Sequence, residues 1–236
     1  MFLLGTIINT IAILLGGIVG HYLNQDHQDG LTMASGISIL FIGISGAMSG
    51  MLKLSSHHGL SSGQSMLVVA CLALGALFGE VMGIEARFEN FGDWIKLKSG
   101  NANDNQFVNS FVTASLTVCI GAMAILGPIQ NALNGDISLL VTKSVLDFII
   151  IMVMTTSLGK GCVFSAIPVF LFEGSIAILS RLLQPLLTSE AIANIALIGS
   201  ILIFCVGLNL IFGKRIKVAN LLPAIIFAAF IAYLNY

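Results

Sequence analysis

Residues 136–183 read DISLLVTKSVLDFIIIMVMTTSLGKGCVFSAIPVFLFEGSIAILSRLL and decide the fold of the chain. They form two long apolar runs, separated by the short segment Gly159-Lys160-Gly161, and each run is long enough to cross a bilayer as a helix. Lys143, Asp147 and Glu173 lie inside these runs. An ionised side chain at the centre of such a helix costs roughly 2.5 to 3.5 kcal/mol, so residues of this kind usually face a partner or a water-filled cavity. The three charges therefore mark a candidate site.

Spacing suggests how these charges are accommodated. Lys143 and Asp147 are four residues apart, which places them one turn apart on one helix face, where they can pair. Glu173 has no such partner on its own segment. Pro168 removes a backbone donor and frees the carbonyl of Phe164, and a kink beside an acid is one way in which transporters build a site near the midplane. The alternative interpretation is a structural ion pair and a neutral, hydrogen-bonded Glu173.

Asn9 and Asn209 extend the candidate site. Both are amides near glycines in apolar segments, and each can supply a neutral oxygen ligand. Hydrogen bonding between helices is the commoner role of such amides. The candidate transport or ion-binding residues are Asn9, Lys143, Asp147, Pro168, Glu173 and Asn209.

The composition is that of an integral membrane protein with little mass outside the bilayer. Hydrophobic residues make up 57% of the chain and charged residues 9%, whereas a soluble domain carries about 25% charged residues. The net charge of −1 gives no argument for nucleic acid as a partner. The four cysteines lie in or beside apolar segments without CxxC spacing, so no metal site and no cofactor is expected.

Hydropathy predicts an all-α, polytopic bundle in one membrane domain, residues 1–236. Eight candidate spans run from about 2–23, 31–52, 65–83, 108–129, 137–158, 162–183, 191–212 and 218–233. Seven spans is the alternative, because the last segment is short and the third is rich in glycine.

One segment between the spans is too charged to cross. Residues 84–98, IEARFENFGDWIKLK, place apolar side chains at helical spacing, and Trp94 with Lys96 and Lys98 suits the headgroup region. We expect an amphipathic helix on the cytoplasmic face, weakened by Gly92.

Lysine and arginine are unevenly distributed over the predicted loops. Seven fall in one set of alternate loops, namely Arg87, Lys96, Lys98, Lys160, Lys214, Arg215 and Lys217, and only Lys53 and Arg181 fall in the other set. With eight spans, the positive-inside rule places both termini outside the cytoplasm.

Glycine patterns suggest an internal repeat. The runs IGISGAMSG at 42–50, IGAMAILG at 120–127 and VGLNLIFG at 206–213 are each followed by a short loop and another apolar run. Units of about 1–83 and 162–236 would then form an inverted repeat, linked by the 84–98 helix and the spans within 108–158. Close packing of small residues explains the glycines equally well.

Enzymatic chemistry is not expected. The run Gly43–Gly46, GISG, fits the GxSG string of rhomboid-type serine proteases, but that chemistry needs a histidine base on a later helix. The four histidines, His21, His27, His57 and His58, all fall at span ends or in loops.

The order of motifs resembles the YqgA/YdfK-like family, bacterial integral membrane proteins of unknown-function family 554. The motifs are GTIINTIAILLGGIVG, GIEARFENFGDWI, SLTVCIGAMAILGPIQNALNGD, KSVLDF, LGKGCVFSAIPV, FEGSIAIL, GLNL and NLLPAI, and they cover nearly the whole chain. The resemblance implies a multi-pass protein of the bacterial inner membrane and implies no activity.

The leading hypothesis is a secondary transporter or ion-coupled carrier of a small solute, with Asp147 and Glu173 as cation or proton ligands and Lys143 as counter-charge. A channel or pore-forming oligomer is the first alternative, and a membrane scaffold or sensor is the second. The glycine-rich spans also suggest a homo-oligomer. The identity of the solute or ion does not follow from the sequence.

Overall fold

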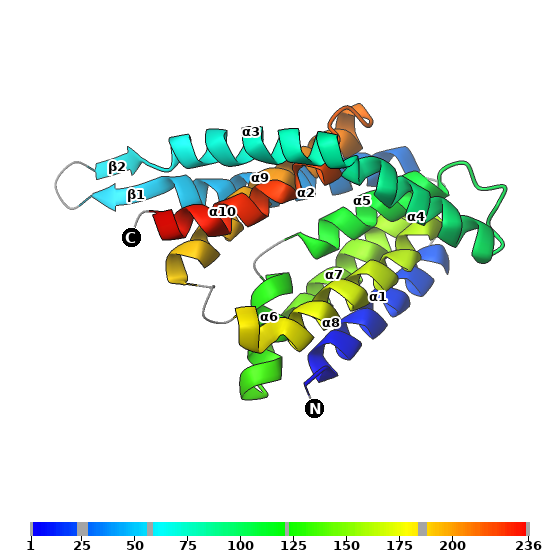
Figure 1. The fold of residues 1–236 in the computed structure, drawn as a ribbon. Helices are drawn as coiled ribbons and strands as arrows, with labels where there is room; N and C mark the ends of the chain where they lie inside the picture. The colour runs from blue at the N-terminus through cyan, green and yellow to red at the C-terminus, as the bar shows by residue number, and fades with distance from the viewer. Residues whose placement is uncertain (1, 23–27, 56–58, 121–122, 184–187, 235–236) are drawn as a thin grey trace.

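The computed structural model describes residues 2–22, 28–55, 59–120, 123–183 and 188–234, which form a bundle of helices (Figure 1). The α-helices are α1 (Leu4–Tyr22), α2 (Gln28–Met51), α3 (Ser65–Met82), α4 (Ile84–Lys98), α5 (Phe107–Cys119), α6 (Met123–Asn134), α7 (Ser138–Leu158), α8 (Ala166–Leu183), α9 (Ser189–Phe212) and α10 (Pro223–Leu234). Short 3-10 helices, η1 (Lys160–Ser165) and η3 (Val218–Leu221), precede α8 and α10. The predicted helical membrane bundle is confirmed.

A small β-hairpin departs from the purely helical prediction. Strands β1 (Leu52–Ser55) and β2 (Gly59–Ser62) pair antiparallel in a segment expected to be loop. Leu52 to Ser55 do alternate apolar and polar residues, but four residues are too short a run to predict a strand, and Leu52 falls at the end of the predicted span 31–52.

All eight predicted spans contain helix, but their lengths differ from expectation. Among the described residues, five helices are long and apolar enough to cross a membrane, and six if α5 and α6 count as one bent span. Gly36–Met51 and Val218–Ala232 are shorter apolar helices. The predicted continuous span 108–129 is corrected, because α5 and α6 meet at an angle of 58°.

Helices that pack together run in the directions that alternating spans require. Gly5 lies against Leu140 and Gly20 against Met152, so α1 and α7 are parallel. By the same comparison of contacts, α2 is antiparallel to α9 and α3 is antiparallel to α10. The first and fifth spans therefore point one way, and each of the other pairs joins an odd span to an even one.

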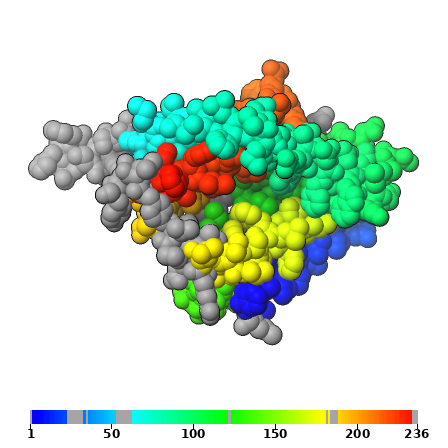
Figure 2. Space-filling view, viewed as in Figure 1, coloured from blue at the N-terminus to red at the C-terminus, as the bar shows by residue number. Residues whose placement is uncertain are grey.

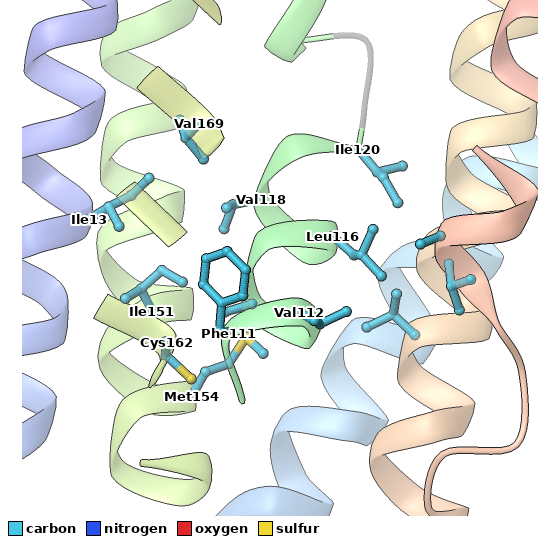
Figure 3. Close-up of a cluster of buried hydrophobic side chains, with 14 of the residues drawn as sticks. Ile13, Phe111, Val112, Leu116, Val118, Ile120, Ile151, Met154, Cys162 and Val169 are labelled. Atoms are coloured by element: carbon cyan, nitrogen blue, oxygen red, sulfur yellow. The ribbon is translucent and has the colours of Figure 1, made fainter. Parts of the chain in front are cut away.

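The bundle has two layers, with α5 between them. In Figure 1, α2, α3, α9 and α10 lie together above α1, α6, α7 and α8. Most of α5 is buried, and Figure 3 shows Phe111 and Val118 directed toward α1, α7 and α8 while Leu116 and Ile120 point toward the opposite layer. The main apolar core is thus assembled around α5.

The segment predicted to be an amphipathic helix, residues 84–98, is α4 with the same bounds, and it packs on α5 and η3. Phe91 meets Phe111 edge-on, with ring centroids 5.9 Å apart. A Cβ at Gly92 would lie 2.9 Å from the Phe111 ring, so the glycine expected to weaken α4 permits its close approach to α5. Trp94 and Leu97 remain exposed on the outer side.

Large apolar side chains cover the outside of the bundle. In Figure 2, α3 and α8 form much of the surface facing the viewer. On α3 the exposed side chains include Met66, Val69, Leu77 and Val81. Such a surface is suited to lipid and unsuited to water.

Candidate functional site

Lys143 and Asp147 lie one turn apart on α7, as their spacing predicts, and their side chains form an ion pair. The Lys143 ammonium also donates a hydrogen bond of 2.8 Å to the carbonyl oxygen of Val118. This carbonyl belongs to the last turn of α5, where the helix dipole favours a cation. Lys143 therefore joins α7 to the end of a broken helix.

Glu173 reaches the same ion pair from α8. Its Oε1 lies 3.7 Å from Lys143 Nζ and accepts a hydrogen bond of 2.8 Å from Asn9 Nδ2. The partners of Glu173 thus come from other helices, which explains why its own segment showed none.

Asn9 on α1 completes the cluster by donating both amide hydrogens. One hydrogen bond goes to Glu173, and the other goes to Asp147 Oδ2 at 3.0 Å. We call Asn9, Lys143, Asp147 and Glu173 the interior cluster. Their exposed fractions are 0%, 5%, 4% and 0%, so the cluster is sealed from its surroundings in this conformation.

Glycines on α1 make this approach possible. A Cβ at Gly16 would lie 2.4 Å from the backbone oxygen of Phe148, and one at Gly20 would lie 2.2 Å from that of Met152. Both distances are shorter than any real contact, so only glycine lets α1 pack on the α7 backbone. The GTIINTIAILLGGIVG motif therefore brings Asn9 within hydrogen-bonding distance of Asp147.

The cluster has more acceptors than donors. Asn9 Oδ1 and Glu173 Oε2 are buried without a hydrogen-bond partner, and so is Thr6 Oγ1, one turn before Asn9 on α1. Buried polar atoms are normally satisfied, and each orphan needs an explanation. The unpaired oxygens favour a bound proton or cation.

Pro168 lies within the first turn of α8, where a missing backbone donor costs nothing. The irregular backbone lies just upstream, as the 3-10 helix η1. The predicted kink beside Glu173 is therefore replaced by a change of helix type before α8. Pro168 itself is buried and is not among the hydrogen-bonding members of the cluster.

Asn209 is not part of the interior cluster. Its Oδ1 accepts hydrogen bonds from the backbone N–H groups of Arg215 and Ile216, and its Nδ2 donates to the Ile216 carbonyl. Asn209 thus holds the connector between α9 and η3. Its position beside glycines in an apolar segment could not distinguish this role from ligand binding.

A second group of charges lies at the end of the bundle that carries α4. Lys214 pairs with Glu85, at 2.8 Å, and with Glu89. Burial alone would lower the pKa of Lys214, but the hydrogen bonds and charges of Glu85 and Glu89 outweigh it and raise the pKa above its ordinary value. We call these three residues the peripheral cluster.

A cavity of about 160 Å³ lies beside the peripheral cluster. Glu85 and Lys214 line it, and its wall follows α5 from Asn109 to Leu116. Leu116 faces the layer opposite to the one that Val118 faces, so this cavity lies on the other side of α5 from the interior cluster. A second, more open cleft of about 470 Å³ lies between the 100–106 connector and Ser157–Lys160.

The described residues contain no group of three or more His, Cys, Asp or Glu side chains that could hold a metal ion. His27, His57 and His58 lie outside the described residues. Gly43 and Gly46 of the GISG run contact α9 at Phe204 and Ser200, so both glycines serve helix packing.

Comparison with known proteins gives the family. Residues 4–233 match the model of the family described as "Protein of unknown function (DUF554)". The chain is 31% identical to "Uncharacterized membrane protein YdfK" of Bacillus subtilis (strain 168) over 226 residues, which cover 94% of this chain and 92% of that protein. It is 29% identical to "Uncharacterized protein YqgA" of Escherichia coli (strain K12) over 234 residues, covering 95% and 94%. No solved structure matches. A family match over nearly the whole chain, together with apolar helices of spanning length, confirms the resemblance: the protein is a membrane protein of the DUF554 family.

Proposed function

We propose that this protein is a secondary carrier of a small solute across the bacterial inner membrane, and that the interior cluster is its ion- or solute-binding site. The observation that carries the proposal is a group of three charges and an amide, sealed in the bundle and left with unpaired oxygens. Ionisable side chains at such depth are expensive to keep and mark ion or solute pathways in membrane proteins.

The helices around the cluster support this proposal. The cluster joins α1, α7 and α8 to the last turn of α5, where the fourth predicted span breaks. Discontinuous helices beside a buried binding site are typical of secondary transporters, because a helix end offers unpaired backbone groups to an ion or solute.

The packing of the outer helices also supports a carrier. α1 runs antiparallel to η1 and α8, α2 to α9, and α3 to α10, as an inverted repeat of 1–83 and 162–236 would require. A Cβ at Gly43 would lie 2.5 Å from Phe204 N, and one at Gly207 would lie 2.7 Å from Leu40 N. Equivalent glycines thus make reciprocal contacts, and two inverted halves that rock against each other give alternating access.

The orientation belongs to the same proposal. Lys214 and Lys217 bind Glu85 and Glu80, and so bring their connector to α4, which carries Arg87, Lys96 and Lys98. The α4 end is therefore the basic end, and the hairpin of β1 and β2 lies at the opposite end (Figure 1). The positive-inside rule favours a cytoplasmic α4 and both termini outside. A C-terminal reporter that works only in the cytoplasm should be inactive, and an active reporter would contradict this orientation.

Flux through purified protein in proteoliposomes tests the carrier. The probes are small amino acids, monocarboxylates, Na⁺ and H⁺, applied as concentration jumps while the membrane current and the internal pH are recorded. Asp147→Asn and Glu173→Gln keep the side-chain shape and should abolish the wild-type response. The matched control is Glu80→Gln, the same change at an exposed ion pair, which should leave it unchanged. Equal flux in wild type and both cluster variants would remove the proposal.

A scaffold or sensor is the second candidate, and the sealing of the cluster favours it. Lys143 ties three helices together without any exposed path, which is what a purely structural ion pair would do. In that case Lys143→Ala lowers thermal stability, and no probe changes the stability of the wild type. A pore is less well supported, because neither of the two cavities described above is lined by a residue of the interior cluster.

The bilayer is the expected partner, and a homo-oligomer is part of the proposal. The exposed apolar side chains of α3 are available to lipid or to a second copy of the chain. Cross-linking in native membranes should yield a discrete oligomer, and a monomer at all cross-linker concentrations would contradict it. Neither an enzymatic activity nor a nucleic-acid partner is proposed.

A further inference from the structure

We infer that the interior cluster binds a dehydrated monovalent cation, with Na⁺ as the probe ion, through Glu173 Oε2, Asn9 Oδ1 and Thr6 Oγ1. This inference rests on the proposed function, because it names the ion class for the same site. It also makes a claim about binding that holds whether or not a solute is carried.

The count of donors and acceptors is the first step. Both amide hydrogens of Asn9 are used by Asp147 and Glu173, and the Lys143 ammonium is directed at Val118, Asp147 and Glu173. None of these donors is left for Asn9 Oδ1 or Glu173 Oε2. The Thr6 hydroxyl carries a proton of its own, but it forms no hydrogen bond with either oxygen. What these two oxygens lack is therefore an electron-pair acceptor.

The net charge is the second step. With Lys143, Asp147 and Glu173 ionised, the cluster carries one positive and two negative charges, a net charge of −1 in an apolar interior. A monovalent cation makes the cluster neutral, whereas a divalent cation would leave it at +1. Since an uncompensated charge at this depth is costly, the balance selects the monovalent ion.

The chemistry of the unpaired atoms is the third step. They are a carboxylate oxygen, an amide oxygen and a hydroxyl oxygen, and all three residues are 0% exposed. Oxygen ligands of these kinds suit hard cations. A proton on Glu173 would neutralise the cluster, but it would give a partner to at most one of the other two oxygens. A cation accepts several oxygen ligands at once.

Thermal unfolding of the purified protein tests the site without any transport assay. NaCl is titrated against choline chloride at constant ionic strength, so that only the identity of the cation changes. A ligand that binds only the folded state should raise the Tm saturably, by roughly 5 to 10 °C at a hundredfold excess over its Kd. KCl and LiCl series report the selectivity.

Substitutions locate the response. Glu173→Gln and Asn9→Ala should each weaken the apparent Na⁺ affinity by at least about tenfold, because each removes a buried ligand oxygen or its charge. The matched control is Asn194→Ala, which removes another buried amide, one that donates to the Ala228 carbonyl far along the chain from the cluster. This control should keep the wild-type Na⁺ response even if its basal Tm falls. Should Asn9→Ala fail to fold, Thr6→Val is the near-isosteric replacement, with the same expected direction.

Three outcomes would overturn the inference. The first is a wild-type Tm that rises equally with Na⁺ and choline, and the second is a Na⁺ response that survives in Glu173→Gln. The third is a Tm that depends on pH while no alkali cation changes it, which would assign the cluster to a proton alone. If Na⁺ binds but no solute is transported, the proposed carrier function is wrong and the Na⁺ site stands. If a solute is transported but Na⁺ does not bind, the Na⁺ site is wrong and the carrier function stands.

Discussion

The interior cluster and the peripheral cluster have the same charges but differ in how much of them water reaches. Each is one lysine between two carboxylates, but all three interior side chains, of Lys143, Asp147 and Glu173, are at most 7% exposed. In the peripheral cluster only Glu85 is buried, at 8%, while Lys214 and Glu89 are 38% and 41% exposed. Water and salt can compensate Lys214 and Glu89, and the buried Glu85 also accepts a hydrogen bond from the Ala219 backbone N–H. The interior charges have only each other, Asn9 and the end of α5. The difference shows that position, and not composition, makes three charges a candidate site.

Replacing the lysine of each cluster is the strongest test of the difference between the two clusters. Lys143→Met leaves two carboxylates uncompensated in the interior, so the free energy of unfolding should fall by about 3 to 5 kcal/mol. Lys214→Met removes the pairs with Glu85 and Glu89, but Glu85 keeps its hydrogen bond from the Ala219 backbone N–H and Glu89 faces water, so the loss should be only about 1 kcal/mol. Thermal unfolding and the yield of folded protein measure both. Equal losses in the two variants would mean that burial does not distinguish the clusters.

The packing that holds the interior cluster is the next target. Gly16→Ala places a methyl group against the Phe148 carbonyl and should destabilise the protein by about 1 to 3 kcal/mol, because α1 must move away from α7. Gly174→Ala is the matched control, since nothing lies within 4 Å of a Cβ there and alanine favours the helix. If Gly16→Ala leaves the free energy of unfolding unchanged, the hydrogen bonds of Asn9 do not depend on this close approach of α1 to α7.

The peripheral cluster should respond to alkaline pH. The pKa of Lys214 is raised from 10.5 in the folded protein, so its stabilising contribution is fully present below that pH and is lost as the pH rises through the raised value. Wild type should therefore exceed Lys214→Met in Tm at pH 7 to 9 by a small margin that disappears well above pH 10.5. If the difference in Tm between wild type and Lys214→Met stays constant with pH, it comes from packing of the lysine methylene groups and not from the charge.

Salt should produce the smallest effect, and only at the periphery. Raising choline chloride to about 1 M shortens the Debye length to about 3 Å and screens exposed charges. The Tm difference between wild type and Lys214→Met should shrink by an amount equivalent to a few tenths of a kcal/mol. The difference between wild type and Lys143→Met should not change. A shift in the second difference would indicate that salt reaches the interior.

The sequence predicts local features of the candidate site better than the contacts between helices. The pairing of Lys143 with Asp147 follows from helical geometry alone. The contact of Glu173 with Asn9 depends on how α1 and α8 pack, and 164 residues separate the two side chains along the chain. Asn9 was a candidate because it is an amide near glycines in an apolar segment and could supply an oxygen ligand or a hydrogen bond between helices. The same reasoning also selected Asn209, which binds its own connector.

Some features of the fold could not be predicted from the sequence for comparable reasons. Hydropathy predicts apolar helices well, but it does not detect a break inside an apolar run, and α5 therefore merged with α6 in the prediction. Gly92 appeared unfavourable for α4 because helix propensity ignores Phe111 on a neighbouring helix. In both cases tertiary contacts override a local preference.

The separation of the cluster residues along the chain has a consequence for biogenesis. Asn9 enters the membrane with α1, long before α7 and α8 are synthesised, and Glu173 is translated last. During this interval Lys143 and Asp147 can already neutralise each other within α7, which lowers the cost of inserting that helix. Glu173 has no oppositely charged residue one turn away on α8, so it can be buried only after α1 and α7 are in place to contact it. Assembly of the cluster is thus a late checkpoint, at which a chain with a misplaced helix would leave an acid in lipid and become a substrate for quality control.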